Sequence, residues 1–326
     1  MAGIVKYLET GSVDPGYNLA FEEHVLLNRR DAPYLMLWQN DNAVVIGQNQ
    51  NTEAEVDQHF IREHGIRVVR RTTGGGAVYH DLGNLNYSFI ADAKDAGQLT
   101  MERFTLPVVD ALCDLGLDAV VSGRNDISIE GREVSGTAQR LAEGRVLHHG
   151  TLLFDSDPSM LAGALRVDPQ KFRAKRAKSV RSRVGNIHDF LLREGKDMTL
   201  SEFWNHLKKA LAGDGLVPDK LDTWELERVR HLKEERYDSW EWVYGRSPAY
   251  DLCNRRWWDG GELEVRASIK RGRVSDIRFF GDFLAVLPLT ALTEELIGCP
   301  YRREAFRRVL EEHPIKELFG GITMEE

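Results

Sequence analysis

The sequence has few cysteines, no long apolar run and no excess of basic residues. Its 3 cysteines lie far apart without a CxxC spacing, which argues against a disulfide framework and a zinc ribbon. We expect Cys113, Cys253 and Cys299 to be packing residues. The longest apolar runs, such as Tyr34–Trp38, have the length of strands rather than of membrane spans. Residues 1–10 lack a cationic segment followed by an apolar one, so we expect a cytoplasmic location and no membrane contact.

The net charge of -8 disfavours a general nucleic-acid-binding protein, which would carry a basic surface. One segment departs from this acidic character, because residues 171–183 contain seven lysines and arginines in thirteen positions. Such a segment either is solvated surface or closes over a polyphosphate. From charge alone, solvated surface is the more common outcome.

A chain of 326 residues is long enough for about two domains of roughly 150 residues each. Asp14 and Pro15 mark the start of a helix as N-cap and first helical residue. Two strand-like runs, 34–38 and 43–47, flank a turn-like Gln-Asn-Asp-Asn sequence and predict a hairpin. The remaining patterns predict helices over 53–64, 100–115 and 200–236, strands over 66–70 and 84–90, and hairpins about 130–131 and 143–144. Together they predict an α/β (α+β) domain with a mixed sheet.

An aromatic cluster and a proline between Trp240 and Pro248 interrupt the helical pattern, and we place the domain boundary there. This division gives a first domain of residues 1–246 and a second of residues 247–326. The second is predicted to be a small α+β unit, with a hairpin around residues 271–272 and helices over 289–297 and 302–312.

Three consecutive glycines, Gly74, Gly75 and Gly76, form the first candidate functional motif. Without side chains, their backbone can bring amide donors close to phosphate or carboxylate oxygens. Alone, a triple glycine is more often a tight turn. Here the glycines lie among potential donors and cations within fifteen residues: Arg70, Arg71, Val78, Tyr79, His80, Asp81 and Asn84.

Two further groups of polar residues lie at predicted strand ends. Asp126 could hold Mg²⁺ brought by a nucleotide, since that ion prefers one or two carboxylates plus phosphate oxygens, or it could cap a turn. His148 and His149 are adjacent, so in a strand they face opposite sides and cannot bind one metal together. We expect one of them in the core or a pocket and the other exposed.

The motifs, taken in order, resemble those of lipoate-protein ligases. The resemblance covers nearly the whole chain, including a second domain similar to the accessory domain of that family. The motifs that carry it are RRTTGGGAVYHDLGN (70–84), GRNDI (123–127), EVSGTA (133–138), HHGTLL (148–153) and KSVRSRVGNI (178–187).

The resemblance implies a catalytic domain like those of biotin and lipoate ligases and a reaction in two steps. Lipoate or octanoate attacks the α-phosphate of ATP, with Mg²⁺, to give an acyl-adenylate and pyrophosphate. A lysine of an acceptor domain then takes the acyl group. The implied acceptors are lipoyl domains of 2-oxoacid dehydrogenase E2 subunits and the glycine-cleavage H protein, and the implied state is a monomer.

The resemblance also implies two sets of binding residues. The basic segment 171–183 would be the loop that binds the adenylate, and Asp126 would hold the Mg²⁺ of the nucleotide. The implied lipoate-binding residues are Leu19, Trp38, Arg71, Gly76, Val78, His80 and His149. The implied ATP- or adenylate-binding residues are Gly74, Gly75, Gly76, Val78, Tyr79, Asn84, Asp126, Ala138, Lys178 and Arg181.

One position departs from the family. Glu133 occupies the place before Val-Ser-Gly where the family has a catalytic lysine. Three explanations follow from the sequence: a neighbouring cation such as Arg132, Lys175 or Lys178 replaces the lysine; the chain is an ATP-independent acyltransferase or a lipoyl-binding homologue without adenylation; or the residue is a change specific to this chain. A thioester mechanism would need a cysteine near the glycines, whereas Cys113 falls on the apolar face of a predicted helix.

Overall fold

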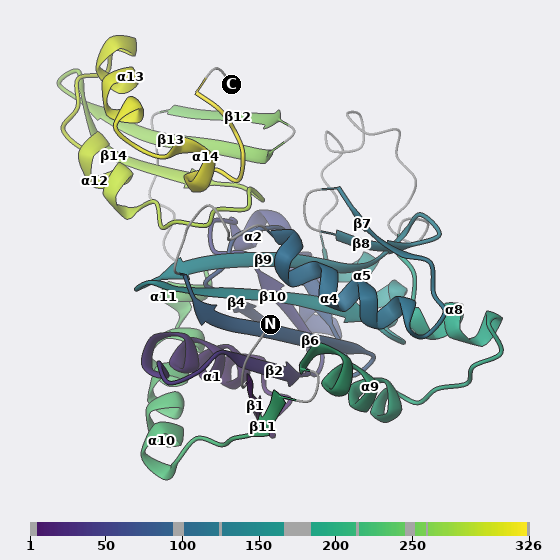
Figure 1. The fold of residues 1–326 in the computed structure, drawn as a ribbon. Coiled ribbons are helices and arrows are strands. Elements are labelled where there is room, and N and C mark those ends of the chain that lie inside the picture. Colours follow the sequence, from purple (N-terminus) through teal and green to yellow (C-terminus); the bar gives the residue numbers. More distant parts are fainter. Residues whose placement is uncertain are drawn as a thin grey trace.

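The computed structural model places most of the chain in two units that lie one above the other (Figure 1). Lys178 and Arg181, two of the predicted adenylate-binding residues, lie outside the residues it describes. The described residues are 5–93, 101–123, 126–165, 184–212, 215–244, 252–258 and 260–324.

The first unit is built on a mixed eight-stranded sheet with the order β11-β1-β2-β6-β10-β9-β8-β7. β1 pairs in parallel with both β11 and β2, and the other pairs are antiparallel, which confirms the predicted mixed-sheet fold class. The predicted hairpins at 130–131 and 143–144 join β8, β9 and β10. The strands are β1 (Val5–Glu9), β2 (Tyr34–Trp38), β6 (Asn84–Asp92), β7 (Ala119–Ser122), β8 (Asp126–Ile129), β9 (Arg132–Ala142), β10 (Arg145–Leu153) and β11 (Leu216–Pro218).

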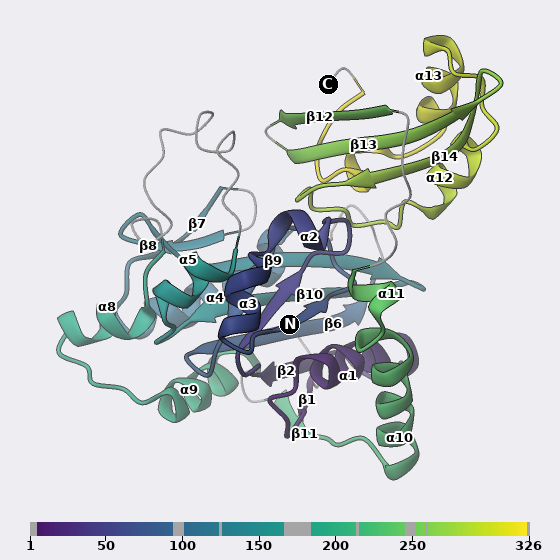
Figure 2. The ribbon, with the colours of Figure 1, turned by 180° about the vertical axis from the view of Figure 1, so that it is seen from behind.

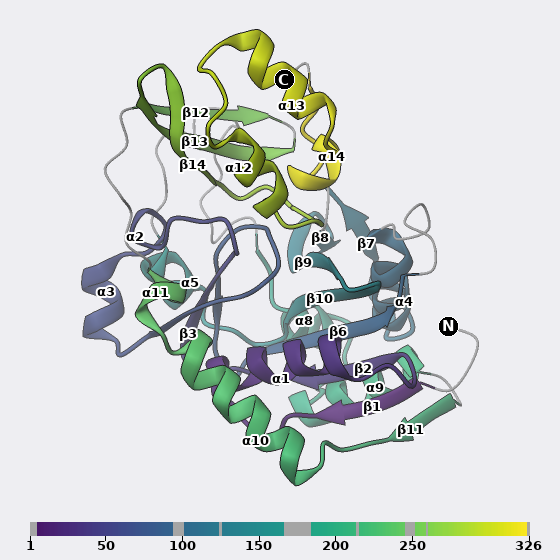
Figure 3. The same ribbon diagram turned by 90° about the vertical axis from the view of Figure 1, so that its left-hand side faces the viewer.

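Helices cover both faces of this sheet, so its central strands are apolar on both sides. In β2, Leu35 and Leu37 pack in one core cluster, while Tyr34 and Met36 pack in the cluster on the opposite face. The first face carries α4 (Met101–Cys113), α8 (Ile187–Arg193) and α9 (Leu200–Ala212). The second face carries α1 (Pro15–Asn28) and α10 (Thr223–Leu232), which lie together in Figure 3, and η3 (Lys233–Tyr237), which contacts both.

A smaller sheet with the order β4-β3-β5 lies on the second face. β3 (Ala43–Ile46) pairs with β4 (Arg67–Arg70) and β5 (Val78–His80) but not with β2. The predicted hairpin of 34–38 with 43–47 is therefore wrong. Both strands are buried along their whole length, and each lies between two strands of its own sheet.

The helix predicted over 53–64 is broken into α2 (Thr52–Glu55) and α3 (Gln58–Glu63). Val56 is completely buried and forms an isolated bridge with Leu165. Asp57 then caps α3 by accepting hydrogen bonds from the backbone of His59 and Phe60. Beyond the bridge, the short helix α5 (Pro158–Ala164) packs against α3 (Figure 2).

The second unit is an antiparallel sheet, β12-β13-β14, with three helices packed on one side (Figure 1). Its predicted hairpin is confirmed, with the turn at Arg271 and Gly272 between β13 and β14. The short helix α11 (Trp240–Val243) precedes it in the chain. The elements are β12 (Leu252–Trp258), β13 (Gly261–Lys270), β14 (Arg273–Phe280), α12 (Thr290–Leu296), α13 (Arg303–Glu311) and α14 (Ile315–Leu318).

The cysteines do not all pack in the core as expected. Cys299 is buried, but Cys113 and Cys253 are exposed. Cys113 is the last residue of α4, where the helix ends at the surface. Across the parts of the chain that the structure describes, no helix has the length and apolar character needed to cross a membrane.

Candidate active site

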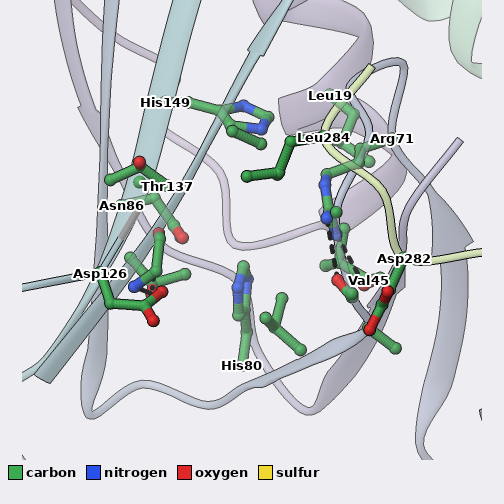
Figure 4. A pocket seen from close by; sticks show the side chains of 18 of the residues that line it. Leu19, Val45, Arg71, His80, Asn86, Asp126, Thr137, His149, Asp282 and Leu284 are labelled. Atoms are coloured by element: carbon green, nitrogen blue, oxygen red, sulfur yellow. Dashed lines mark hydrogen bonds between the residues drawn. The ribbon is translucent and has the colours of Figure 1, made fainter. Parts of the chain in front are cut away.

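A pocket of about 260 Å³ lies on the second face of the large sheet, between the sheet, helix α1 and the glycine-rich loop (Figure 4). Strand pairing builds its floor. Ser88, His149 and Ala138 are register partners on β6, β10 and β9, so they form one row across the sheet. Trp38 pairs with Asn86 in the next row.

One wall of the pocket is apolar. Leu19 reaches it from α1, whose start is fixed as predicted by Asp14, which accepts a hydrogen bond from Tyr17 N at 2.9 Å. Trp38 is buried, and its indole nitrogen donates to Ser88 Oγ at 2.8 Å, which leaves the carbon surface of the ring for the pocket. Val45 completes this wall from the smaller sheet.

The glycine loop is held by Arg71, which is buried and whose pKa burial lowers to about 10. Its guanidinium donates to the carbonyls of Val45, Gly74 and Gly76 at 2.7–3.1 Å. Four of its five N–H groups are used within the protein, since Nε also donates to Thr73. Arg71 therefore shapes the pocket chiefly by fixing the loop.

The second unit closes the pocket on the side of the glycine loop. Gly75 N donates to the carbonyl of Phe283 at 3.1 Å, so this amide is bonded to the second unit. A methyl group on Gly74 would lie 2.7 Å from that carbonyl oxygen, which explains why a residue without Cβ is needed there. Asp282 and Leu284 of the same segment line the pocket.

The opposite end of the pocket is acidic. Asp126 and Glu133 both line it, and a methyl group on Gly136 would lie 3.9 Å from a carboxylate oxygen of each. The pairing of β8 with β9 shifts here, which inserts Val134 as an extra residue in β9. Glu133 thus lines the pocket while its neighbour Val134 packs in the core on the other face.

His80 points into the centre of the pocket (Figure 4). Asn40 donates to its Nδ1 at 3.0 Å, so the ring proton lies on Nε2. Burial, reinforced by Arg71 and His149, lowers the pKa of His80 to about 3, and the ring is neutral at pH 7. Among the described residues Nε2 has no partner, although it is buried. The pocket therefore presents an N–H donor for an acceptor oxygen.

His149 lies in the pocket wall, as predicted, but His148 is not exposed. Its side chain is completely buried on the other face of β10, stacked on Phe104 with ring centroids 5.2 Å apart. The expectation of one exposed histidine is wrong because helices cover both faces of the sheet at this strand.

The structure brings most of the predicted site residues together. Gly74 and Asn84 do not line the pocket, and Asn84 is buried with its amide bonded to Asn86. Tyr79 lines a neighbouring pocket of about 270 Å³ that shares Val78, Glu133 and Gly136 with the first. The predicted residues that line the first pocket are Leu19, Trp38, Arg71, Gly75, Gly76, Val78, His80, Asp126, Glu133, Ala138 and His149.

Nine residues that line the pocket were not among the predicted site residues: Val45, Ala77, Asn86, Gly136, Thr137, Gly150, Thr151, Asp282 and Leu284. Val45 lies in an apolar strand with no polar marker, and only the position of β3 beside the large sheet brings it here. Asp282 and Leu284 come from the second unit. No local pattern could reveal that contact, because it depends on how the two units pack.

Comparison with known protein families shows to which family this chain belongs. The profile for the lipoyl protein ligase A/B catalytic domain matches residues 14–212. The profile for the bacterial lipoate protein ligase C-terminus matches residues 247–326. The chain belongs to the lipoate-protein ligase family. Lipoate-protein ligase LplJ of Bacillus subtilis is 42% identical over 320 residues, which cover 96% of this chain and 95% of that protein.

Solved structures of the family agree with this assignment. A lipoate-protein ligase A bound with ATP is 31% identical with a TM-score of 0.64, covering 75% of this chain and 99% of its own. A bipartite lipoate protein ligase of Thermoplasma acidophilum, described with its E2 lipoyl domain, is 34% identical with a TM-score of 0.66. That match covers 77% of this chain and 100% of the other.

Proposed function

We propose that this chain is an ATP-dependent lipoate-protein ligase that forms lipoyl-adenylate, or octanoyl-adenylate, and transfers the acyl group to a lysine of an acceptor domain. The observation that carries the proposal is the pocket itself. Its apolar wall, with Leu19, Trp38 and Val45, suits an acyl chain, and the free Nε2–H of His80 suits a carboxylate or acyl-phosphate oxygen.

The neighbouring pocket suits the adenylate. It shares the lining residues Val78 and Glu133 with the first, and its wall also contains Leu165 and Val184. These two residues flank the segment that contains the predicted adenylate-binding loop, 171–183. A nucleotide in this pocket would therefore lie beside Leu165 and Val184, the described residues at the two ends of that segment, and beside Tyr79.

Asp126 has the right chemistry for the Mg²⁺ that accompanies ATP. Its carboxylate converges with that of Glu133 over Gly136, and carboxylate oxygens are the ligands that Mg²⁺ prefers. In the described ranges no cluster of three or more metal-binding side chains occurs, so the phosphate oxygens of the nucleotide would supply the remaining ligands. The ion would neutralise charge on the phosphates during adenylation.

The positions of the cysteines argue against an acyltransferase that works through a thioester. None of the three lines the pocket, and Cys113 lies on α4, on the opposite side of the sheet.

The acceptors that suit the proposed function are lipoyl domains of 2-oxoacid dehydrogenases and the glycine-cleavage H protein. We propose a cytoplasmic monomer.

The proposed function is tested by the intact mass of a lipoyl acceptor domain after incubation with this protein, lipoate and Mg²⁺. We expect an increase by one lipoyl group only when ATP is present. If modification needs no ATP but requires an acyl group pre-loaded on a carrier domain, which leaves as the free carrier lysine or thiol, the protein is an acyltransferase and not a ligase. If neither lipoate nor a non-hydrolysable ATP analogue binds in a calorimetric titration, the proposal is wrong.

Leu284 offers a test of the acyl pocket. Replacing it by alanine removes apolar surface that the second unit presents to the pocket, and we expect lipoate to bind about fivefold more weakly, or about 1 kcal/mol. Isothermal titration measures the change. The control is Leu252→Ala, an exposed leucine of the same unit, which should leave the affinity unchanged. Equal affinities in both variants would mean that Leu284 does not contact the acyl group.

A further inference from the structure

Glu22 is a buried carboxylate that lies below the pocket rather than in its wall. It comes from α1, is 2% exposed, and has no lysine or arginine nitrogen within 4 Å in the part of the chain that the structure describes. A buried carboxylate is costly unless hydrogen bonds compensate it. Here two side chains supply them: Ser88 Oγ donates at 2.6 Å and His149 Nδ1 at 2.9 Å.

The partners of His149 define its tautomer. Carboxylate oxygens accept hydrogen bonds, and both oxygens of Glu22 face Nδ1 at 2.9 and 3.1 Å, so Nδ1 is the donor on this side of the ring. On the other side of the ring, Nε2 lies 2.8 Å from Thr73 Oγ1. That hydroxyl accepts a hydrogen bond from Arg71 Nε at 2.9 Å, so Thr73 links His149 to Arg71.

This hydrogen-bonded chain ends at the glycine loop. Arg71, its last side chain, donates to the carbonyls of Gly74 and Gly76 at 2.7 and 2.8 Å. From the same carboxylate a second branch runs through Ser88 to the indole of Trp38 at 2.8 Å. Glu22 therefore connects the apolar wall of the pocket with the loop at its polar end.

We propose that Glu22 is a positioning residue for lipoate activation: its carboxylate holds His149 as the Nδ1–H tautomer and thereby fixes the glycine loop and Trp38 around the acyl group. This proposal rests on the function proposed above. Glu22 acts through His149 and Ser88 and does not touch the substrate. At metal sites, removing the partner that orients a ligand side chain typically costs about tenfold or more, and we expect an effect of this size for Glu22.

The neighbouring Glu23 provides a matched control. It lies on the same helix and is equally buried at 2%, but it bonds to Arg140, Arg236 and the hydroxyl of Tyr237 instead. None of these partners lines the pocket. Glu22→Gln and Glu23→Gln therefore remove the same charge from the same depth, and only the first interrupts the chain to the glycine loop.

The first measurement needs no substrate. In ¹⁵N-histidine NMR spectra of the full-length protein, with the His149 signal assigned by its loss in His149→Asn, we expect the ring proton of His149 on Nδ1. Glu22→Gln should remove this fixed tautomer, and Glu23→Gln should preserve it. A proton on Nε2 in the unaltered protein would overturn the proposal.

The second measurement is ligand affinity by calorimetry. We expect Glu22→Gln to weaken lipoate binding about tenfold and to change the affinity for a non-hydrolysable ATP analogue less than twofold. Glu23→Gln should alter neither affinity even where it lowers the melting temperature. Combined with His149→Asn, Glu22→Gln should add no further loss of lipoate affinity, because both substitutions act through one contact.

Unchanged lipoate affinity in Glu22→Gln would overturn the proposal. Absence of lipoate binding in the unaltered protein would refute the proposed function and leave the tautomer test intact.

Discussion

Replacing Glu133 by lysine is expected to raise the rate of lipoyl-adenylate formation by about 100-fold or more. Glu133 lines both pockets and converges with Asp126 over Gly136, where the proposed function places the phosphates of ATP. At about 4 Å and an effective dielectric constant of about 20, one pair of unit charges interacts by about 4 kcal/mol. The substitution replaces a repulsion by an attraction of similar size. If about 2.7 kcal/mol of this difference lowers the activation barrier, the rate rises about 100-fold.

The rate is measured as lipoate-dependent exchange of pyrophosphate into ATP at saturating Mg²⁺. Glu130→Lys makes the same change of charge three residues away, at an exposed position that pairs with Arg193, and should change the rate less than twofold. If Glu133→Lys also changes it less than twofold, another group already supplies the positive charge. Arg132, Lys175 and Lys178 would then be replaced in turn to find it.

Acidification from pH 7.5 to pH 5 is expected to lower the free energy of unfolding by about 4 kcal/mol through two buried histidines. Burial lowers the pKa of both His80 and His148 to about 3. In the unfolded chain each histidine has its ordinary pKa of about 6.5, so between pH 6.5 and 3 the unfolded chain binds more protons than the folded protein. The contribution of each neutral histidine to the free energy of unfolding is therefore fully present above pH 6.5 and is lost as the pH decreases. At pH 5 the loss is roughly 2 kcal/mol for each histidine.

Urea unfolding at the two pH values measures this loss. In His148→Leu the loss on acidification should be about 2 kcal/mol smaller, because leucine does not titrate. The substitution breaks no hydrogen bond among the described residues, since both ring nitrogens of His148 lack partners there. The control is His59→Gln, since 84% of the His59 side chain is exposed. An equal loss in His148→Leu and the unaltered protein would show that His148 does not carry the effect.

Local patterns predicted the elements whose signals lie within the chain segment itself. The start of α1 at Asp14, the hairpins at 130–131 and 143–144 and the hairpin of the second unit all depend on caps or tight turns, and all are confirmed. The strand β11 was missed, because its three residues include a proline and pair with a strand more than 200 residues away.

The pairing of 34–38 with 43–47 could not be predicted from the turn between them. A turn composition indicates that the chain reverses direction, but β2 and β3 belong to different sheets, and each of the two strands is buried on both faces.

The residues of the candidate site could also be predicted only in part. The polar residues of the glycine loop and β10 were found from their motifs, whereas Glu22 had no marker other than its place beside the apolar stripe of α1. Its hydrogen bonds to Ser88 and His149 appear only in the packed structure.

The parallel pairing of β1 with β11 sets the order in which the chain can fold during synthesis. Val5 lies opposite Leu216, so the last strand of the large sheet is made when about two thirds of the protein has left the ribosome. At about 5–20 residues per second, β1 waits roughly 10 to 40 s for this partner. Its free edge can pair with other chains during that time. A chaperone that binds extended segments would therefore have its greatest effect before residue 216 is reached, and truncation before this strand should favour aggregation.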